Sequence, residues 1–277
     1  MTISVASGKG GTGKTTVAVN LALSLSNTQL LDCDVEEPNS HIFIKPEIND
    51  KEPVSIPVPK LISERCNYCG KCAEVCAYNA IAVLKDNVLI FPELCHGCGS
   101  CVYFCERDAL EEVYKEIGFV ETGNKGNLQF VHGKLNVGEM MATPLIKAVK
   151  KHNDKEMLTI IDVPPGTACP FIEAVKDSDF VLLVTEPTPF GLSDLITSIE
   201  VLKQLNIPFG VVINRFDIGD EKVEDYCERE NIPILLKIPF RKEIAIAYSN
   251  GKIIVEELPE YKEKFKKLHK KITELIK

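Results

Sequence analysis

The sequence feature that most restricts the possible folds is the glycine loop SGKGGTGKTT at residues 7–16. It stands between TISVAS (residues 2–7), which has the composition of a buried strand, and TTVAVNLALSL (residues 15–25), whose apolar residues recur at helical spacing. A loop of this kind turns backbone N–H groups toward a polyphosphate, which also meets the positive end of the following helix. We therefore predict a phosphate-binding strand–loop–helix unit; the alternative is a glycine-rich turn without a ligand.

The loop completes the pattern G-x-x-x-x-G-K-[ST] with Gly8, Gly13, Lys14 and Thr15. In this pattern the lysine reaches the β- and γ-phosphates of a nucleotide, and the hydroxyl binds Mg²⁺. Lys9 is a second cation that the pattern does not require. The predicted nucleotide-binding residues of the loop are Gly8, Lys9, Gly10, Gly11, Thr12, Gly13, Lys14, Thr15 and Thr16.

Acidic residues stand at the ends of two apolar runs. Asp32 and Asp34 end LLDCD (residues 30–34), and Asp162 ends the apolar part of MLTIIDV (residues 157–163). Carboxylates at the C-terminal ends of parallel strands lie beside the phosphate crevice, where they hold Mg²⁺ through water or orient an attacking water. The alternative for a single aspartate at such a position is a helix N-cap.

The rest of the chain alternates strands with helices. Apolar runs at 179–186, 209–216 and 234–239 are separated by helical stretches such as 192–205. Near-continuous apolar strands alternating with helices indicate an α/β fold with a mostly parallel sheet covered by helices on both faces. Residues 118–135 read as a hairpin that turns at NKGN, whereas residues 45–60, with four prolines, read as a linker.

Eight of the eleven cysteines fall between Cys66 and Cys105, and each half of this block has the spacing C-x₂-C-x₂-C-x₃-C. The two runs, CNYCGKCAEVCAYNAI and CHGCGSCVYFCERDAL, resemble bacterial ferredoxins with two [4Fe–4S] clusters, and zinc is the alternative. In those ferredoxins the fourth cysteine of each run ligates the other cluster. The resemblance implies one cluster on Cys66, Cys69, Cys72 and Cys105 and a second on Cys95, Cys98, Cys101 and Cys76. The proline usual after the fourth cysteine is replaced by Ala77 and by Glu106.

Outside the cysteine block, GKGGTGKTT, LLDCDVEEPN, IIDVPPGT and VVINRFD follow one another in an order that resembles the deviant P-loop ATPases of the MinD, ParA and Mrp type. The resemblance implies ATP and Mg²⁺ as ligands and a homodimer across the nucleotide site. It assigns Lys9 to the partner subunit's nucleotide and Asp34 to the hydrolytic water. Asp162 would belong to the switch that responds to the γ-phosphate, and Asn214 would contact adenine.

Together the modules resemble MinD-superfamily ATPases with an inserted small α+β ferredoxin-like domain. We therefore expect residues 1–52 and 117–277 to form the P-loop domain and residues 53–116 to form the ferredoxin domain. Three functions compete: an ATPase that switches electron transfer through the clusters to a redox partner, an iron–sulfur assembly or carrier ATPase that serves an apo-metalloprotein client, and a MinD-like positioning ATPase. Fold alone does not choose among them.

Net charge and hydropathy restrict the expected partners and the expected cellular location. The net charge of −8 argues against nucleic-acid binding, and no apolar run reaches the roughly 18 residues of a membrane span. We expect a cytoplasmic protein. Tyr261, Phe265, Leu268, Ile272 and Leu275 form an apolar stripe at the C-terminal end of the sequence, and we expect this stripe to dock on the sheet rather than on a membrane.

Three further residues have two interpretations each. Cys169 follows Asp162 by seven residues; we favour a small buried residue over a transient metal, cluster or redox site. Cys33 lies between two acids on a strand and is expected in the core. His96 stands between two cluster cysteines, and we expect it to be solvent-exposed rather than a ligand, because each predicted cluster already has four thiolates.

Overall fold

The computed structural model describes residues 1–276 and contains a nine-stranded sheet, with the strand order β11-β10-β9-β1-β8-β2-β7-β6-β3. The strands are β1 (Thr2–Ala6), β2 (Thr28–Asp32), β3 (Glu47–Leu61), β6 (Leu110–Lys125), β7 (Leu128–Leu135), β8 (Leu158–Asp162), β9 (Phe180–Thr185), β10 (Phe209–Asn214) and β11 (Ile234–Ile238). Neighbouring strands from β11 through β7 pair in parallel, and β6 is antiparallel to both β7 and β3. The prediction of a mostly parallel sheet is confirmed.

Helices cover both faces of the sheet because its strands are apolar on both sides. On β9, Phe180, Leu182 and Val184 enter one core, whereas Val181 and Leu183 enter the other. The first core is closed by α1 (Lys14–Ser24), α2 (Ser40–Ile44), α9 (Lys242–Ser249), α10 (Ile254–Glu257) and α11 (Pro259–Ile276). The second is closed by α5 (Ala142–Lys150), α6 (Cys169–Val175), α7 (Pro189–Leu205) and α8 (Lys222–Arg229).

The C-terminal helix α11 packs on α1 and β11, as its apolar stripe predicts. Tyr261, Phe265, Leu268 and Ile272 are buried in the core, and Leu275 at the end of the stripe is exposed. The expectation that α11 docks on the body of the protein is therefore confirmed. Among residues 1–276, no helix has the length and apolar character needed to cross a membrane.

The segment predicted as a linker is a strand, so that prediction is wrong. β3 spans 15 residues and pairs with β6 from Glu47–Asn124 to Leu61–Leu110. β3 is the outermost strand, with a partner on one side only. Proline is tolerated on an edge strand because its missing N–H can face away from the neighbouring strand. The prolines of this segment therefore mark a sheet edge, not a break in structure.

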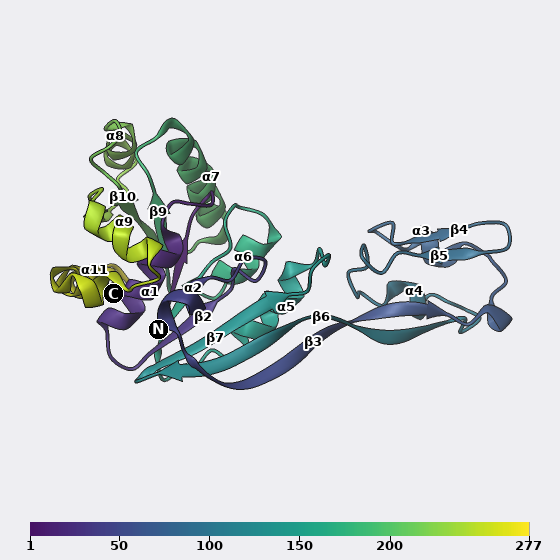
Figure 1. Cartoon of the computed structure of the whole chain (residues 1–277). Helices are drawn as coiled ribbons and strands as arrows, with labels where there is room; N and C mark the ends of the chain where they lie inside the picture. Colours follow the sequence, from purple (N-terminus) through teal and green to yellow (C-terminus); the bar gives the residue numbers. More distant parts are fainter. Residues whose placement is uncertain (277) are drawn as a thin grey trace.

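β3 and β6 continue past the end of β7 as a free two-stranded ribbon that carries a small outer unit (Figure 1). The hairpin of β6 and β7 turns at Gly126, which has a φ of 56°, as predicted. Along the chain, β6 begins to pair with β7 at Gly118. The residue before it, Ile117, has no partner on β3 and forms a bulge. Both expected domain boundaries, 52/53 and 116/117, fall inside strands of this ribbon.

The outer unit consists of two similar halves with few regular elements. These elements are η1 (Ser63–Arg65), α3 (Lys71–Glu74), β4 (Ile81–Val83), β5 (Val88–Ile90) and α4 (Ser100–Tyr103). Gly70 before α3 and Gly99 before α4 both have positive φ, and β4 pairs with β5. The two halves repeat the 29-residue offset of the cysteine runs, so the sequence repeat is also a structural repeat.

Candidate functional site

Lys14 lies at the centre of a cluster of charged side chains at the carboxyl ends of β2 and β8. Its Nζ is 2.9 Å from Oδ1 of Asp162 and 3.2 Å from Oδ2 of Asp34. Lys14 belongs to the glycine loop and is the first residue of α1. Asp162 is the last residue of β8, and Asp34 follows β2. The fold thus brings together three residues that are up to 148 positions apart in the chain.

The buried position of this cluster shifts its pKa values. Burial alone would lower the pKa of Lys14, but the charges of Asp162 and Asp34 raise it well above its ordinary value. Burial, together with the charge of Asp162, raises the pKa of Asp32 to about 7. Burial also raises the pKa of Asp34, against the opposing effect of Lys14. The site thus holds one firmly protonated lysine, and the carboxyls of Asp32 and Asp34 are harder to ionise than usual.

Ser40, the first residue of α2, joins two of these carboxylates. Its backbone N–H donates to Oδ2 of Asp32 at 3.1 Å, and its hydroxyl donates to Oδ2 of Asp162 at 3.2 Å. Asp32 also accepts the backbone N–H of Asp34 at 3.1 Å. Sequence reasoning did not single out Ser40, which follows directly after the motif LLDCDVEEPN.

A cavity of about 860 Å³ opens beside this cluster. Of the predicted loop residues, Gly10, Gly11, Gly13, Lys14, Thr15 and Thr16 line it. The lining also includes Asn214, as predicted, and a group that the sequence did not indicate, Phe240, Arg241 and Tyr248. A cavity of this size, lined by the glycine loop and by aromatic side chains, suits a phosphorylated ligand with an aromatic base.

Two glycines of the loop are required by close packing. A Cβ on Gly13, which has a φ of 91°, would collide with the amide of Asn214. A Cβ on Gly8 would collide with the backbone carbonyl of Asp194 on α7. Nδ2 of Asn214 also donates to the carbonyl oxygen of Thr12 at 2.9 Å, so the end of β10 holds the loop directly.

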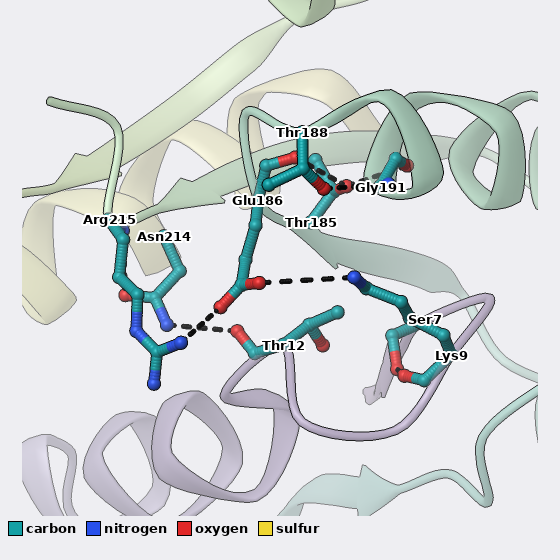
Figure 2. A network of polar contacts seen from close by, with 9 residues as sticks. All are labelled: Ser7, Lys9, Thr12, Thr185, Glu186, Thr188, Gly191, Asn214 and Arg215. Atoms are coloured by element: carbon teal, nitrogen blue, oxygen red, sulfur yellow. Dashed lines mark hydrogen bonds and ion pairs between the residues drawn. The ribbon is translucent and has the colours of Figure 1, made fainter. Parts of the chain in front are cut away.

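Lys9 is not among the residues that line the cavity, and its side chain reaches toward Glu186 at the end of β9 (Figure 2). Its Nζ lies 4.0 Å from Oε2 of Glu186, whose Oε1 accepts from Nη1 of Arg215 at 2.7 Å. Ser7 donates to the carbonyl of Lys9 at 2.7 Å. Neither Glu186 nor Arg215 was predicted, although Glu186 ends an apolar strand just as Asp162 does. The rule that selected Asp162 would have found Glu186.

The eight clustered cysteines line two separate cavities in the outer unit. Cys66, Cys69, Cys72 and Cys105 line one of about 280 Å³, and Cys76, Cys95, Cys98 and Cys101 line one of about 20 Å³. Each cavity thus receives three cysteines from one run and the last cysteine of the other. Within residues 1–276, no three His, Cys, Asp or Glu side chains converge as they would on a single metal ion.

Backbone N–H groups donate to sulfur in the same way in both halves. Tyr68 donates to Cys66 and Ala80 to Cys76, and the equivalent donors are Gly97 to Cys95 and Ala109 to Cys105, at 3.3–3.4 Å. N–H···S hydrogen bonds stabilise thiolates and tune iron–sulfur potentials. The geometry after the fourth cysteine is alike in both halves, although Ala77 and Glu106 replace the usual proline.

One wall of the smaller cavity contains an aromatic stack. The rings of His96 and Tyr78 lie 3.5 Å apart, with an interplanar angle of 6°. His96 is exposed to solvent, as expected.

The remaining cysteines divide between core and surface. Cys33 and Cys227 are fully buried, as was expected of Cys33. Cys169 is exposed at the start of α6, so the preferred interpretation as a buried residue is wrong. Its position follows from the turn after Asp162, where PPGTA carries the chain to the surface before α6 begins.

Comparison with known proteins identifies a nucleotide-binding domain. Residues 3–254 match the model of the CobQ/CobB/MinD/ParA nucleotide binding domain. An uncharacterized protein of Methanocaldococcus jannaschii is 34% identical over 285 residues, which cover 100% of this chain and 98% of that protein. An iron–sulfur cluster carrier protein of Rickettsia typhi is 27% identical, with 88% of this chain matched to 63% of the carrier.

The septum site-determining protein MinD of Pyrococcus horikoshii, solved with Mg-ADP, superposes with a TM-score of 0.61 at 20% identity, covering 98% of this chain and 96% of MinD. That likeness shows the fold. The match to the family model spans the glycine loop, the strand-end aspartates and Asn214, and it shows the family as well as the fold. The chain belongs to the CobQ/CobB/MinD/ParA family of nucleotide-binding P-loop ATPase domains.

Proposed function

We propose that this protein is an ATP-dependent iron–sulfur protein, in which nucleotide binding and hydrolysis by a dimer control electron transfer through two [4Fe–4S] clusters. The observation that carries the proposal is the placement of two four-cysteine cavities at the end of a ribbon that leaves the ATPase sheet. β3 runs parallel to β7 and β2, so the ribbon projects beyond the carboxyl ends of the parallel strands, the edge that holds Lys14.

The nucleotide chemistry follows from the charged cluster. Lys14 would exchange its carboxylate partners for the β- and γ-phosphates, and Thr15 would bind Mg²⁺. This exchange frees Asp34 to orient the attacking water and frees Asp162 to respond to the γ-phosphate. Asn214 would contact the base, and Phe240 and Tyr248 line the same cavity.

The position of Lys9 supports the proposal of a dimer. Its side chain faces Glu186 and does not line its own subunit's cavity, so its own nucleotide would be served by Lys14 alone. A second subunit facing the glycine loop would bring another set of phosphates to Lys9. Glu186 then acts as the partner of Lys9 until the second subunit arrives.

The two cysteine sets fit [4Fe–4S] clusters better than zinc. A zinc site needs its four ligands about 2.3 Å from one point, whereas these thiols surround cavities and do not converge. The N–H···S bonds would also stabilise the thiolates that hold a cluster. Each cluster, when bound, supplies one-electron transfer. The walls of the smaller cavity, including the Tyr78–His96 stack, would move apart to admit the second cluster.

The test is an anaerobic electron-transfer assay on the protein loaded with iron and sulfide. The loaded protein is reduced, and transfer to cytochrome c is timed with and without MgATP. We expect MgATP to change the rate, and we expect Lys14→Ala to abolish the effect. Equal rates with and without MgATP in a protein that binds ATP would reject nucleotide control of electron transfer.

A second candidate function is iron–sulfur cluster carriage, in which the clusters are cargo. The similarity to iron–sulfur cluster carrier proteins of Rickettsia typhi and Pyrococcus abyssi, at 27% and 24% identity, favours it. It predicts transfer of ⁵⁵Fe-labelled clusters to an apo-ferredoxin. Label that stays on the protein through many ATP turnovers counts against it. An anaerobic pull-down with MgATP would separate a redox partner from an apo-protein client.

A third candidate is MinD-like positioning on a membrane, suggested by the shared fold. In residues 1–276 the apolar stripe of α11 is largely buried against α1 and β11, which leaves little of it for a lipid surface. Flotation with anionic vesicles and MgATP tests this function, and a protein that stays with the unbound fraction lacks it.

A further inference from the structure

One row of ionisable side chains crosses the sheet from its outer edge to the nucleotide site. Lys51 on β3 is opposite Glu121 on β6, and Glu121 is opposite His132 on β7. His132 is in turn opposite Asp32 on β2, and Asp32 is opposite Asp162 on β8. Residues directly opposite one another in a sheet project from the same face. The five side chains therefore lie on one face, in one line.

The outer part of the row is held by direct contacts. Nε2 of His132 lies 2.8 Å from Oε2 of Glu121, and Nζ of Lys51 lies 3.3 Å from Oε1 of the same carboxylate. Lys51 also stands 3.4 Å above the ring of Phe119. His132 is only 4% exposed, so its pair with Glu121 is shielded from water on the histidine side. A buried polar contact of this kind has few alternative geometries.

The inner part of the row is linked to the same contacts through α2. Ser40 binds both Asp32 and Asp162, and the next residue, His41, packs its ring against His132 with the centroids 5.2 Å apart. β3 begins only two residues after α2 ends, so a shift of α2 also displaces the start of β3, the strand that continues into the ribbon. α2 is therefore connected to one strand of the ribbon by the chain and to the other through His132 and Glu121.

We propose that this row and α2 together transmit the state of the nucleotide site to the cysteine-bearing ribbon. The inference rests on the proposed nucleotide site at Lys14. When Lys14 turns from Asp162 to phosphate, the carboxylate that Ser40 binds loses its cation and changes its contacts. α2 then moves, and His41 and the start of β3 move with it. The ribbon pivots at the bulge at Ile117, where it leaves the sheet.

The test is hydrogen–deuterium exchange of the intact protein with and without saturating MgATP. In the wild type we expect MgATP to change the rate of amide hydrogen exchange in residues 55–61 and 110–116 by at least about threefold. Glu121→Gln should abolish that change while nucleotide affinity stays as in the wild type. The matched control is Glu111→Gln, which makes the same substitution on the same strand. Glu111 pairs with Lys60 beyond the point where the ribbon leaves the sheet, so the response should persist.

A second variant guards against a folding defect in Glu121→Gln. His41→Leu leaves the Glu121–His132 pair intact but removes the polar ring that joins α2 to the row, and it should also abolish the response. The proposal is overturned if either variant, folded and saturated with MgATP, keeps the wild-type response. It is also overturned if the wild-type ribbon does not respond. Failure of nucleotide binding itself, measured by calorimetry, would instead reject the proposed function.

Discussion

The ammonium of Lys14 and the carboxylate of Asp162 form an ion pair, with 2.9 Å between Nζ and Oδ1 and both side chains almost fully enclosed. Desolvation makes a lone buried charge costly, so each member depends on the other. The lysine that is predicted to meet phosphate is therefore already bound to the residue that is predicted to sense it. If Lys14 binds phosphate as proposed, it exchanges one partner for another, and the arrival of phosphate would change the contacts of Asp162.

Lys14→Ala should weaken nucleotide binding about 10- to 100-fold, because hydrogen bonds to charged phosphate contribute about 1.5–3 kcal/mol. Isothermal titration calorimetry with MgADP measures the change. Lys242→Ala on the exposed start of α9 serves as the control and should bind normally. Wild-type affinity in Lys14→Ala would show that the phosphates bind elsewhere.

Lys9→Ala should lose ATP-dependent dimerisation yet keep nucleotide affinity close to that of the wild type. The reason is that Lys9 faces Glu186 and not the cavity of its own subunit. Sedimentation velocity with a non-hydrolysable ATP analogue reports the oligomeric state, and calorimetry reports the affinity. A variant that still dimerises with the analogue would contradict the role assigned to Lys9.

Asp34→Asn should slow ATP hydrolysis by about 10²-fold or more, the usual contribution of a group that positions or deprotonates the attacking water. Binding of MgATP should remain, since Asp34 is not expected to hold the phosphates. Phosphate release under single-turnover conditions measures the effect. If Asp34→Asn hydrolyses ATP at the wild-type rate, another group must orient the water.

Cys105→Ala and Cys69→Ala should lose the same cluster, although the two residues belong to different runs. Both line the larger cavity, so each variant should keep about four of eight iron atoms. Cys76→Ala should instead lose the other cluster, and Cys227→Ser, in the core, should keep both. Iron analysis and electron paramagnetic resonance of the reduced protein distinguish these outcomes. A spectrum in which Cys105→Ala matches Cys98→Ala would contradict the exchange of fourth ligands.

Asp32 should make the ligand-free protein less stable as pH rises. Its folded pKa of about 7 exceeds the ordinary 3.8, so the folded chain keeps a proton that the unfolded chain has lost. The stabilisation that this proton adds to the free energy of unfolding is fully present below pH 3.8 and is lost as the pH rises through 7. The free energy of unfolding falls by up to about 1.4 kcal/mol per pH unit over this range. In Asp32→Asn, the free energy of unfolding measured in urea should depend less steeply on pH between pH 5 and pH 7. Equal slopes for the two proteins would mean that Asp32 is ionised throughout.

Much of the fold follows from local patterns that the sequence displays directly. The apolar run ending in Asp162, the glycine loop before Lys14 and the stripe that contains Phe265 each specify an element and its buried face. The hairpin at Gly126 follows from its turn residues in the same way. These predictions hold because strand alternation, helical periodicity and turn geometry depend on neighbouring residues.

Contacts between distant segments were beyond such patterns. The prolines around Pro57 suggested a linker, and only the pairing with β6 shows that they lie on the outer strand of a ribbon. Ser40 became a site residue only because α2 is packed against the ends of β2 and β8. The exposure of Cys169 likewise depends on the path of the turn after Asp162.

The sequence by itself determined which chemistry the chain carries: a phosphate loop with an additional lysine, strand-end carboxylates and two sets of four thiols. Only the tertiary structure decided how these parts are joined. Lys51, Glu121, His132 and Asp32 form one row because β3, β6, β7 and β2 are neighbours in the sheet. Side-chain periodicity is local, whereas strand order and register depend on packing the whole core, and packing places residues 70 positions apart, such as Lys51 and Glu121, in contact.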